Sequence, residues 1–340
     1  ADETDLNYFE WNDSKIGIIS SGVAYQYAKE VFGDKASYLK LGFTYPLPAK
    51  KIREFAAQVE TLYIIEELEP YLEEQIRQMG ISCIGKEKIP NMYELNPDIV
   101  AKALLNEEKP LIQYDTSLVV NRPPVLCAGC PHRGFFYELS KKKNVVMAGD
   151  IGCYALGGAE PLNAKDMCIC MGAAPSIGHG AQKVFDKFHE NMRVISTIGD
   201  STFFHTGINS IMNIAYNRSK TITVILDNRI TGMTGHQDHP GTGFTLQGTP
   251  TKALAIEGVV KALGIDYVRT VNPLNLRQVR DALDWALALD EPSVIITRWP
   301  CVLKKQSPQD KEEFGAYMAT CKVDTDECIG CQMCVNTGCT

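Results

Sequence analysis

Two polar residues stand directly after short β-branched runs that predict strands. Asp200 follows the run at 194–198, and Asn228 follows the run at 221–226. One carboxylate and one amide oxygen suit a hard cation such as Mg²⁺, which proteins hold with few ligands while phosphate oxygens and water complete its shell. A helix predicted to begin near Ser201 directs its free N–H groups and positive dipole end to the same place, which favours an anion. These residues therefore predict a magnesium–diphosphate site, with two ordinary tight turns as the alternative.

A strand–helix–strand unit must position these side chains. Between the two strands, apolar residues recur at helical spacing and predict a helix that lays one face on the sheet, through Phe203, Phe204, Ile208, Ile211, Met212 and Ala215. Ser201 or Thr202 is the expected cap of this helix. A right-handed crossover brings both strand ends to one edge of a parallel sheet, where open α/β sheets bind ligands. We therefore expect Asp200 and Asn228 to lie close together.

Two glycine-containing segments are expected at the same edge. A strand predicted at 145–148 ends just before the segment 150–153, which reads Asp-Ile-Gly-Cys. The segment 167–174 contains Gly172 and opens a helix that runs to Phe188, and its glycine allows the backbone to approach a ligand closely. The sheet is completed by predicted helices and strands at 135–142, 251–263, 267–271, 276–289 and 294–297.

The chain has twelve cysteines, several of them in clusters. In a large α/β chain without a signal peptide, this grouping fits metal or iron–sulfur ligation better than a disulfide framework. Cys328, Cys331, Cys334 and Cys339 have the spacing C-x₂-C-x₂-C-x₄-C, with which a bacterial [4Fe–4S] ferredoxin motif begins, and zinc is the less favoured alternative. The proline expected next is absent. Either the chain stops inside a ferredoxin-like domain, or these four cysteines hold one cluster with a partner's help.

A separate Cys-x-x-Cys pair, Cys127 and Cys130, is open to several interpretations. It fits a redox dithiol, half of a zinc site or half of an iron–sulfur site, although no second pair follows at zinc-ribbon spacing. Cys153, after a glycine, and Cys301, after a predicted strand, are further candidates. Simple packing is another alternative, because free cysteine is among the most buried residue types.

Composition excludes some classes of protein. The net charge of −7 and the absence of a Lys/Arg block argue against a general nucleic-acid binder. No apolar run approaches the roughly 20 residues of a membrane span, and the chain does not open with a secretory leader. We expect a cytoplasmic protein in a reducing, anaerobic setting.

The elements predict an α/β fold class: two domains with parallel or mixed sheets flanked by helices, followed by a short ferredoxin-like segment. The expected divisions are a linker at 1–14, an α/β domain at 15–85, a connector at 86–121, a second α/β domain at 122–303 and the cluster-bearing segment at 304–340. The first domain is expected to contain strands and helices at 15–20, 23–31, 38–41, 50–59, 61–66, 71–79 and 81–84, with one more helix near 98–105. Its Glu66-Glu67-Leu68-Glu69 is interpreted as a solvated loop or helix start rather than a catalytic acid pair.

The unit from Gly199 to Asn228 resembles the thiamine diphosphate motif that runs from Gly-Asp-Gly to Asn-Asn, with Ser201 in place of the second glycine and Asp227 in place of the first asparagine. The continuation 231–237, Thr-Gly-Met-Thr-Gly-His-Gln, resembles the 2-oxoacid:ferredoxin oxidoreductases, and within them the large (alpha) subunits of the indolepyruvate branch. The resemblance extends from about Lys15 to Cys339. Its first part, including the loop 41–48, is similar to the transketolase C-terminal-like domain of that family.

This resemblance implies a set of site residues. Mg²⁺ would be bound by Asp200, the Asn228 side chain and the Ile230 carbonyl. The thiamine diphosphate pocket would be formed by Cys127, His132, Asp150, Ile151, Gly152, Cys153, Gly172, Gly199, Asp200, Ser201, Asn228, Ile230, Thr231, Gly232 and Met233. A second, proximal [4Fe–4S] cluster would be held by Cys127, Cys130, Cys153 and Cys301, with cysteines that line the pocket without iron as the alternative. His205 and His236 are candidates for ligand contact without an assigned proton-transfer role, and no catalytic residue is assigned.

The implied function is thiamine diphosphate-dependent oxidative decarboxylation of an aryl pyruvate, such as indole-3-pyruvate, to an acyl-CoA, with electrons passing through [4Fe–4S] clusters to ferredoxin. The implied partners are a smaller beta subunit, ferredoxin, CoA and the 2-oxoacid, in a hetero-oligomer. The pyrimidine-binding domain of the family precedes the region seen here, so we expect it upstream or on a separate chain, and this chain alone to be inactive. The alternatives are another 2-oxoacid:ferredoxin oxidoreductase subunit, a non-oxidative thiamine diphosphate decarboxylase and an electron-transfer subunit with a decayed thiamine site.

Overall fold

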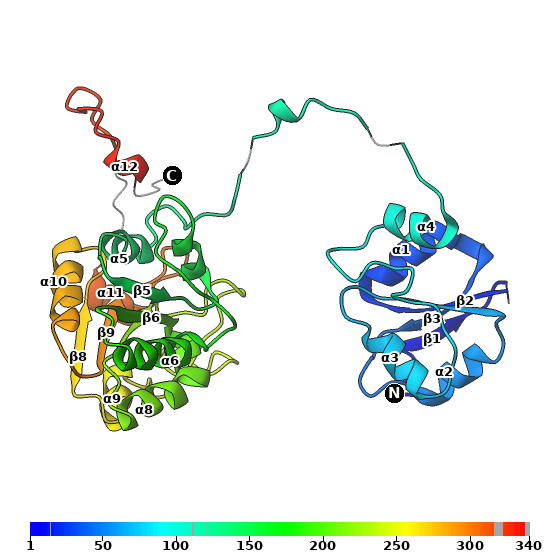
Figure 1. The fold of residues 1–340 in the computed structure, drawn as a ribbon, viewed down its shortest axis with the longest axis horizontal. Helices are drawn as coiled ribbons and strands as arrows, with labels where there is room; N and C mark the ends of the chain where they lie inside the picture. Colours follow the sequence, from blue (N-terminus) through cyan, green and yellow to red (C-terminus); the bar gives the residue numbers. More distant parts are fainter. Residues whose placement is uncertain (14, 111, 121, 316–321, 337–340) are drawn as a thin grey trace. The chain divides into compact units, whose positions relative to one another are not determined.

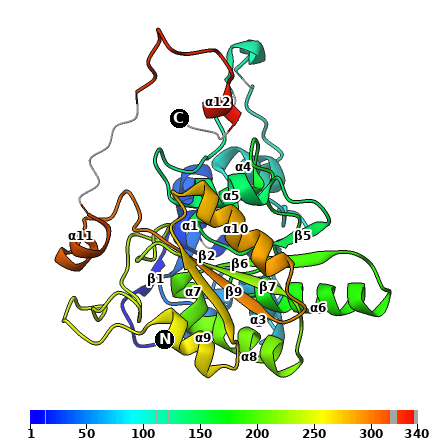
Figure 2. The ribbon, with the colours of Figure 1, turned by 90° about the vertical axis from the view of Figure 1, so that its left-hand side faces the viewer.

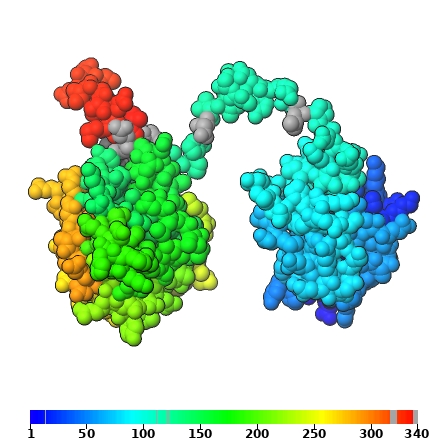
Figure 3. Space-filling view, in the orientation of Figure 1, coloured from blue at the N-terminus to red at the C-terminus, as the bar shows by residue number. Residues whose placement is uncertain are grey.

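The computed structural model describes all residues except 14, 111, 121, 316–321 and 337–340. The chain divides into two units, residues 1–120 and 121–340, each of which is described by itself (Figure 1). Both units are α/β, so the predicted fold class is confirmed. In the space-filling view, helices and loops cover the sheet of each unit (Figure 3).

The first unit is built on a four-stranded sheet in the order β1-β3-β2-β4. Its strands are β1 (Asn7–Glu10), β2 (Ile16–Ser21), β3 (Ser37–Leu41) and β4 (Thr61–Ile65), and only β1 runs antiparallel to its neighbour. Successive residues of β2 point to opposite faces, so Ile18 packs with α1 and α4 while Ile19 packs with α2 and α3. These helices are α1 (Gly22–Phe32), α2 (Ala49–Ala56), α3 (Tyr71–Gln78) and α4 (Pro97–Leu105).

Three expectations for this unit are corrected. The segment 1–14 is not a plain linker, because β1 pairs with β3 and the fully buried Asn7 accepts hydrogen bonds from the amides of Gly42 and Phe43 at 3.0 and 2.9 Å. A short, polar edge strand buries few side chains, so it has no clear hydrophobic pattern. The strand expected at 81–84 is a single bridge between Tyr63 and Ile84. The start of the expected connector belongs to this unit, since Val100 of α4 lies in its core.

The acidic segment after β4 begins a helix, as predicted, but its first carboxylate is buried rather than solvated. Glu66 is 7% exposed and accepts hydrogen bonds from the amides of Leu72 and Glu73, in the first turn of α3, at 2.8 and 2.9 Å. Burial raises the pKa of Glu66, although these two hydrogen bonds oppose the shift. Glu66 therefore serves as the N-terminal acceptor that α3 lacks at its own cap, Pro70.

Replacing this acceptor should loosen α3. We expect Glu66→Ala to reduce amide protection in Tyr71–Gln78 by about 1–2 kcal/mol, because two buried N–H groups lose their partner. Hydrogen exchange followed by mass spectrometry measures this directly. The matched control is Glu69→Ala, which removes an exposed carboxylate from the same segment. Equal exchange in the two variants would show that Glu66 is not the acceptor that holds the helix.

The second unit is built on five parallel strands in the order β5-β6-β7-β9-β8 (Figure 2). They are β5 (Val145–Ala148), β6 (Arg193–Gly199), β7 (Ile222–Asp227), β8 (Tyr267–Val271) and β9 (Ser293–Arg298). Helices α5 and α10 pack on one face around Ile195, and α8 and α9 pack on the other around Ile198. The helices are α5 (His132–Leu139), α6 (Ala174–Lys187), α8 (Ile208–Tyr216), α9 (Ile256–Ala262), α10 (Leu276–Leu287), α11 (Pro308–Phe314) and α12 (Met333–Asn336).

The helix between β6 and β7 differs in detail from its prediction. It begins one residue earlier, as α7 (Asp200–Thr202), with Gly199 as its N-cap and no side-chain cap, so neither Ser201 nor Thr202 caps it. Asp200 lies in its first turn instead, where a negative charge is favourable. A π-helical turn at Phe203–Gly207 separates α7 from α8. The extra residue of a π turn shifts the following face, so Met212 is 51% exposed and Ile214 takes the predicted buried place.

Candidate functional site

The two residues that were expected to meet do so at the carboxyl edge of the second sheet. Asp200 follows β6, and Asn228 follows the neighbouring strand β7. Their exposed fractions are only 3% and 8%, and both line one cavity of about 90 Å³. A buried carboxylate and a buried amide oxygen on one cavity form a donor set of the kind that Mg²⁺ prefers. Their role as ligands stays a prediction.

A tight loop after Asn228 forms one wall of this cavity. The Asn228 Oδ1 atom accepts a hydrogen bond from the Ile230 amide at 3.2 Å. Thr231 and Gln237 exchange backbone hydrogen bonds at 3.0 and 3.3 Å, which closes the segment between them into a loop. The loop thereby presents several predicted residues to the cavity. The predicted site residues that line it are Ile151, Gly152, Cys153, Gly199, Asp200, Ser201, Asn228, Ile230, Thr231, Gly232 and Met233.

Two predicted pocket residues, Asp150 and Gly172, are not among those that line the cavity. Asp150 is fully buried and accepts hydrogen bonds from the amides of Ile151 at 2.6 Å and of Gly172 at 2.8 and 2.9 Å. Burial raises the pKa of Asp150, although these backbone hydrogen bonds oppose the shift. Asp150 therefore fixes the loop that leads into α6, and Met171 of that loop reaches the cavity.

The sequence did not single out Tyr154, which also lines the cavity. Its hydroxyl donates to the Ile151 carbonyl at 2.9 Å. Its ring fits because two glycines have no side chain: a Cβ atom on Gly152 or Gly199 would lie 2.6 or 2.8 Å from Tyr154 Cε1. These two glycines were the available signal for a large side chain nearby. Met171, Thr202, Leu226 and Thr234 complete the unpredicted lining.

A second cavity of about 250 Å³ contains four cysteines in its lining: Cys127, Cys130, Cys153 and Cys301. Cys153 lines both cavities, so the two adjoin there. Burial, with the neighbouring thiols, raises the pKa of Cys130 to about 12. Within the part of the chain that the structure describes, no three His, Cys, Asp or Glu side chains are spaced to hold a metal ion. The structure thus gathers the four cysteines around one cavity, and their ligation of a cluster stays a prediction.

His132 lines the cysteine cavity rather than the first one. It is 2% exposed, and burial lowers its pKa to about 4, so the ring is neutral at pH 7. Its Nε2 atom is buried without a hydrogen-bond partner among the described residues. Since buried polar atoms are nearly always satisfied, this nitrogen is available to a bound group.

The other histidines separate clearly. His205 is exposed and its Nδ1 lies 3.0 Å from Thr206 Oγ1, and His236 is exposed at the rim of the cysteine cavity. His239, which the sequence did not single out, is the one that reaches the predicted metal ligand: its Nε2 atom lies 3.1 Å from Asp200 Oδ2. Only the fold could show this contact, because the two residues are 39 positions apart.

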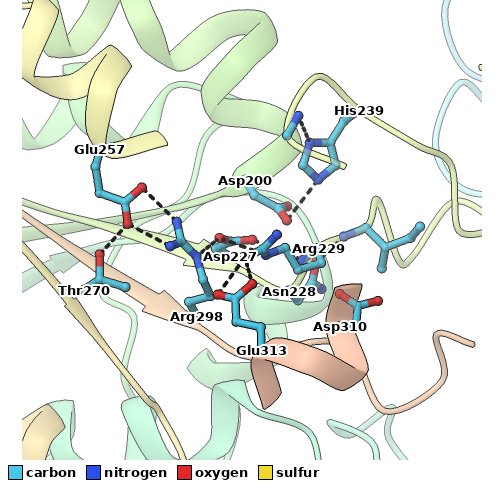
Figure 4. A network of polar contacts seen from close by, with 12 residues as sticks. Asp200, Asp227, Asn228, Arg229, His239, Glu257, Thr270, Arg298, Asp310 and Glu313 are labelled. Atoms are coloured by element: carbon cyan, nitrogen blue, oxygen red, sulfur yellow. Dashed lines mark hydrogen bonds and ion pairs between the residues drawn. The ribbon is translucent and has the colours of Figure 1, made fainter. Parts of the chain in front are cut away.

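A charged network lies beside the predicted metal site (Figure 4). Arg298 donates to Asp227 at 2.6 Å and to both carboxylate oxygens of Glu257 at 2.8 and 3.0 Å. Burial would raise the pKa of Glu257, but hydrogen bonds from Arg298 and Thr270 outweigh it and lower that pKa to about 2. Asp227 is 3% exposed, so this network keeps a buried charge compensated next to the predicted metal ligands.

The terminal cysteine motif is only partly visible. Cys328, Cys331 and Cys334 are exposed, and Cys339 lies outside the described residues. Helices long and apolar enough to cross a membrane are absent from the described residues.

The comparisons with known proteins agree with this geometry. Residues 146–297 match the family described as thiamine pyrophosphate enzyme, C-terminal TPP binding domain. The indolepyruvate oxidoreductase subunit IorA of Archaeoglobus fulgidus is 38% identical over 98% of this chain and 56% of its own length. The subunits of that name from Pyrococcus horikoshii and Thermococcus kodakarensis are 34% and 35% identical over 99% and 97% of this chain. The chain spans about half the length of these relatives. It carries the TPP-binding domain of thiamine pyrophosphate enzymes and belongs, as a part of that length, to the family of indolepyruvate oxidoreductase subunit IorA.

Proposed function

We propose that this chain forms the Mg²⁺–thiamine diphosphate-binding part of an oxidoreductase that decarboxylates an aryl 2-oxoacid, such as indole-3-pyruvate, oxidatively to an acyl-CoA. The observation that carries the proposal is the adjacency of two cavities. One is lined by Asp200 and Asn228, the other by four cysteines, and Cys153 lines both. The similarity to indolepyruvate oxidoreductase subunits supports the choice of substrate.

The residues of the first cavity fit the cofactor. Asp200, the Asn228 amide oxygen and the Ile230 carbonyl would hold Mg²⁺, because all three supply hard oxygen donors at one place. The amides at the start of α7 would face the diphosphate. When bound, thiamine diphosphate supplies the carbanion that attacks the keto carbon and the electron sink for loss of CO₂. The chain contributes binding and orientation, while Tyr154, Met171 and Leu226 restrict water in the cavity.

The residues of the second cavity fit an electron acceptor. Four thiols surround one space, and the buried Nε2 atom of His132 has no described partner. A [4Fe–4S] cluster held by Cys127, Cys130, Cys153 and Cys301 would take electrons one at a time close to the thiamine site. The terminal motif of Cys328, Cys331, Cys334 and Cys339 would hold the next cluster on the way to ferredoxin.

The complete reaction belongs to an assembly, because the chain covers only 56% of the length of its relative from Archaeoglobus fulgidus. The remaining parts would be the pyrimidine-binding domain, the smaller beta subunit and the site for CoA. We expect this chain alone to bind Mg²⁺–thiamine diphosphate weakly and not to turn over.

The test is turnover by the assembled oxidoreductase under anaerobic conditions, with CoA and a viologen as electron acceptor. Indole-3-pyruvate should give CO₂, acyl-CoA and reduced viologen in equal turnover, and faster than pyruvate or 2-oxoglutarate. Release of CO₂ with an aldehyde and without viologen reduction would instead indicate a non-oxidative decarboxylase. A preference for pyruvate or 2-oxoglutarate would contradict the aryl substrate.

A further inference from the structure

The hydrogen bond between His239 and Asp200 is buried on both sides. The side chains are 3% and 4% exposed, and His239 Nε2 lies 3.1 Å from Asp200 Oδ2 (Figure 4). In such surroundings a hydrogen bond to a carboxylate is stronger than in water, and leaving either partner unpaired is costly. The pair therefore restricts how the Asp200 carboxylate turns.

The other ring nitrogen determines which way this hydrogen bond runs. The Gly241 amide donates to His239 Nδ1 at 3.1 Å, so Nδ1 is an acceptor and carries no proton. A neutral imidazole then carries its proton on Nε2, the atom that faces Asp200. This tautomer is assigned from the hydrogen-bond network. His239 is therefore the donor, and Asp200 remains an anionic acceptor.

The turn that follows His239 fixes the ring in place. The Thr242 amide and hydroxyl both donate to the His239 carbonyl at 2.9 Å. The ring lies against Phe204, with centroids 5.9 Å apart. Gly241 is required for this fit, since a Cβ atom there would lie 2.9 Å from Phe204 and 3.0 Å from His239 Cε1. The donor is thus held rigidly before any cofactor arrives.

Asp200 keeps acceptor capacity for a metal ion after these contacts. Its Oδ1 atom accepts from the Ser201 amide at 2.8 Å, and its Oδ2 atom accepts from His239. Each carboxylate oxygen can accept about two hydrogen bonds or ligands, so each retains one acceptor position. We propose that His239 is a positioning residue, whose Nε2–H orients Asp200 for the Mg²⁺–diphosphate group. This inference rests on the proposed thiamine diphosphate site.

Two amide substitutions test the proposal. The amide nitrogen of His239→Gln can take the place of Nε2, whereas that of the shorter His239→Asn can take only the place of Nδ1. The measurement is the Mg²⁺ dissociation constant of the assembled oxidoreductase at saturating thiamine diphosphate, followed by cofactor quenching of intrinsic fluorescence. We expect His239→Asn to weaken Mg²⁺ binding by about 10–100-fold, as for other lost hydrogen bonds to metal ligands, and His239→Gln to stay within a few-fold of wild type.

A third variant and a control complete the design. His239→Phe keeps a ring against Phe204 without a donor, and should bind Mg²⁺ as weakly as His239→Asn if it folds by circular dichroism. His205→Gln, an exposed histidine of the neighbouring helical run, should leave the constant unchanged. Equal constants for His239→Gln and His239→Asn would overturn the proposal, since only the former retains the donor. Absence of Mg²⁺-dependent binding in the wild type would instead overturn the proposed function itself.

Discussion

Asp200→Asn should abolish Mg²⁺-dependent binding of thiamine diphosphate, with a loss of more than about 100-fold in affinity. Loss of a neighbour that only orients a metal ligand costs about 10–100-fold, so loss of the charged ligand itself must cost more. Asparagine keeps the volume of the side chain and one oxygen, and Asp200 is 3% exposed, so the substitution removes the charge and changes little else. Calorimetric titration of the assembled oxidoreductase with thiamine diphosphate, at fixed Mg²⁺, measures the effect.

A neighbouring aspartate provides the matched control for this substitution. Asp238 lies in the same part of the chain but lines a different cavity, with Lys304 and Lys305. Asp238→Asn should bind thiamine diphosphate as the wild type does. Wild-type affinity in Asp200→Asn would contradict the assignment of Asp200 as a metal ligand, even if turnover were lost.

Arg298→Met should be the most destabilising substitution beside the site, at about 3–5 kcal/mol. The Asp227 carboxylate, which is 3% exposed, would lose its 2.6 Å hydrogen bond and keep only the more distant Arg229 Nε at 3.7 Å. Glu257 would lose two hydrogen bonds at the same time. Urea unfolding, followed by near-ultraviolet circular dichroism, measures the change in the free energy of unfolding.

Two further variants separate charge from geometry in this network. Arg298→Lys keeps the charge but cannot make the same forked contacts, so it should recover only part of the lost stability. Arg218→Met removes an exposed pair with Glu291 and should change stability by no more than about 0.5 kcal/mol. If Arg298→Met were as mild as Arg218→Met, the buried charge of Asp227 would not need Arg298.

The main elements of the site were predictable because their signals are local. The β-branched runs that became β6 and β7 are short and distinct, and parallel strands bring Asp200 and Asn228 to one edge. The four cysteines around the second cavity were also foreseen, although their spacing for a cluster was not tested. Local pattern failed for the edge strand β1, whose residues are mostly polar or part-exposed.

The contacts that complete the site depend on the fold, and the sequence pattern does not reveal them. His239 meets Asp200 only after the loop beyond β7 folds back, and Tyr154 fits only where Gly152 and Gly199 leave space. The π-helical turn after α7 likewise changed which residues face the core, because helical periodicity assumes a regular helix. Met212 was misplaced for this reason.

The most direct test of the account is joint analysis of thiamine diphosphate, iron and sulfide in anaerobically purified oxidoreductase, per copy of this chain. The account predicts one thiamine diphosphate with about eight irons and matching sulfide, four for the cysteine cavity and four for the terminal motif. About four irons, lost when Cys328 and Cys331 are replaced, would remove the proximal cluster from the account. Thiamine diphosphate without iron would contradict the oxidative function and leave a decarboxylase.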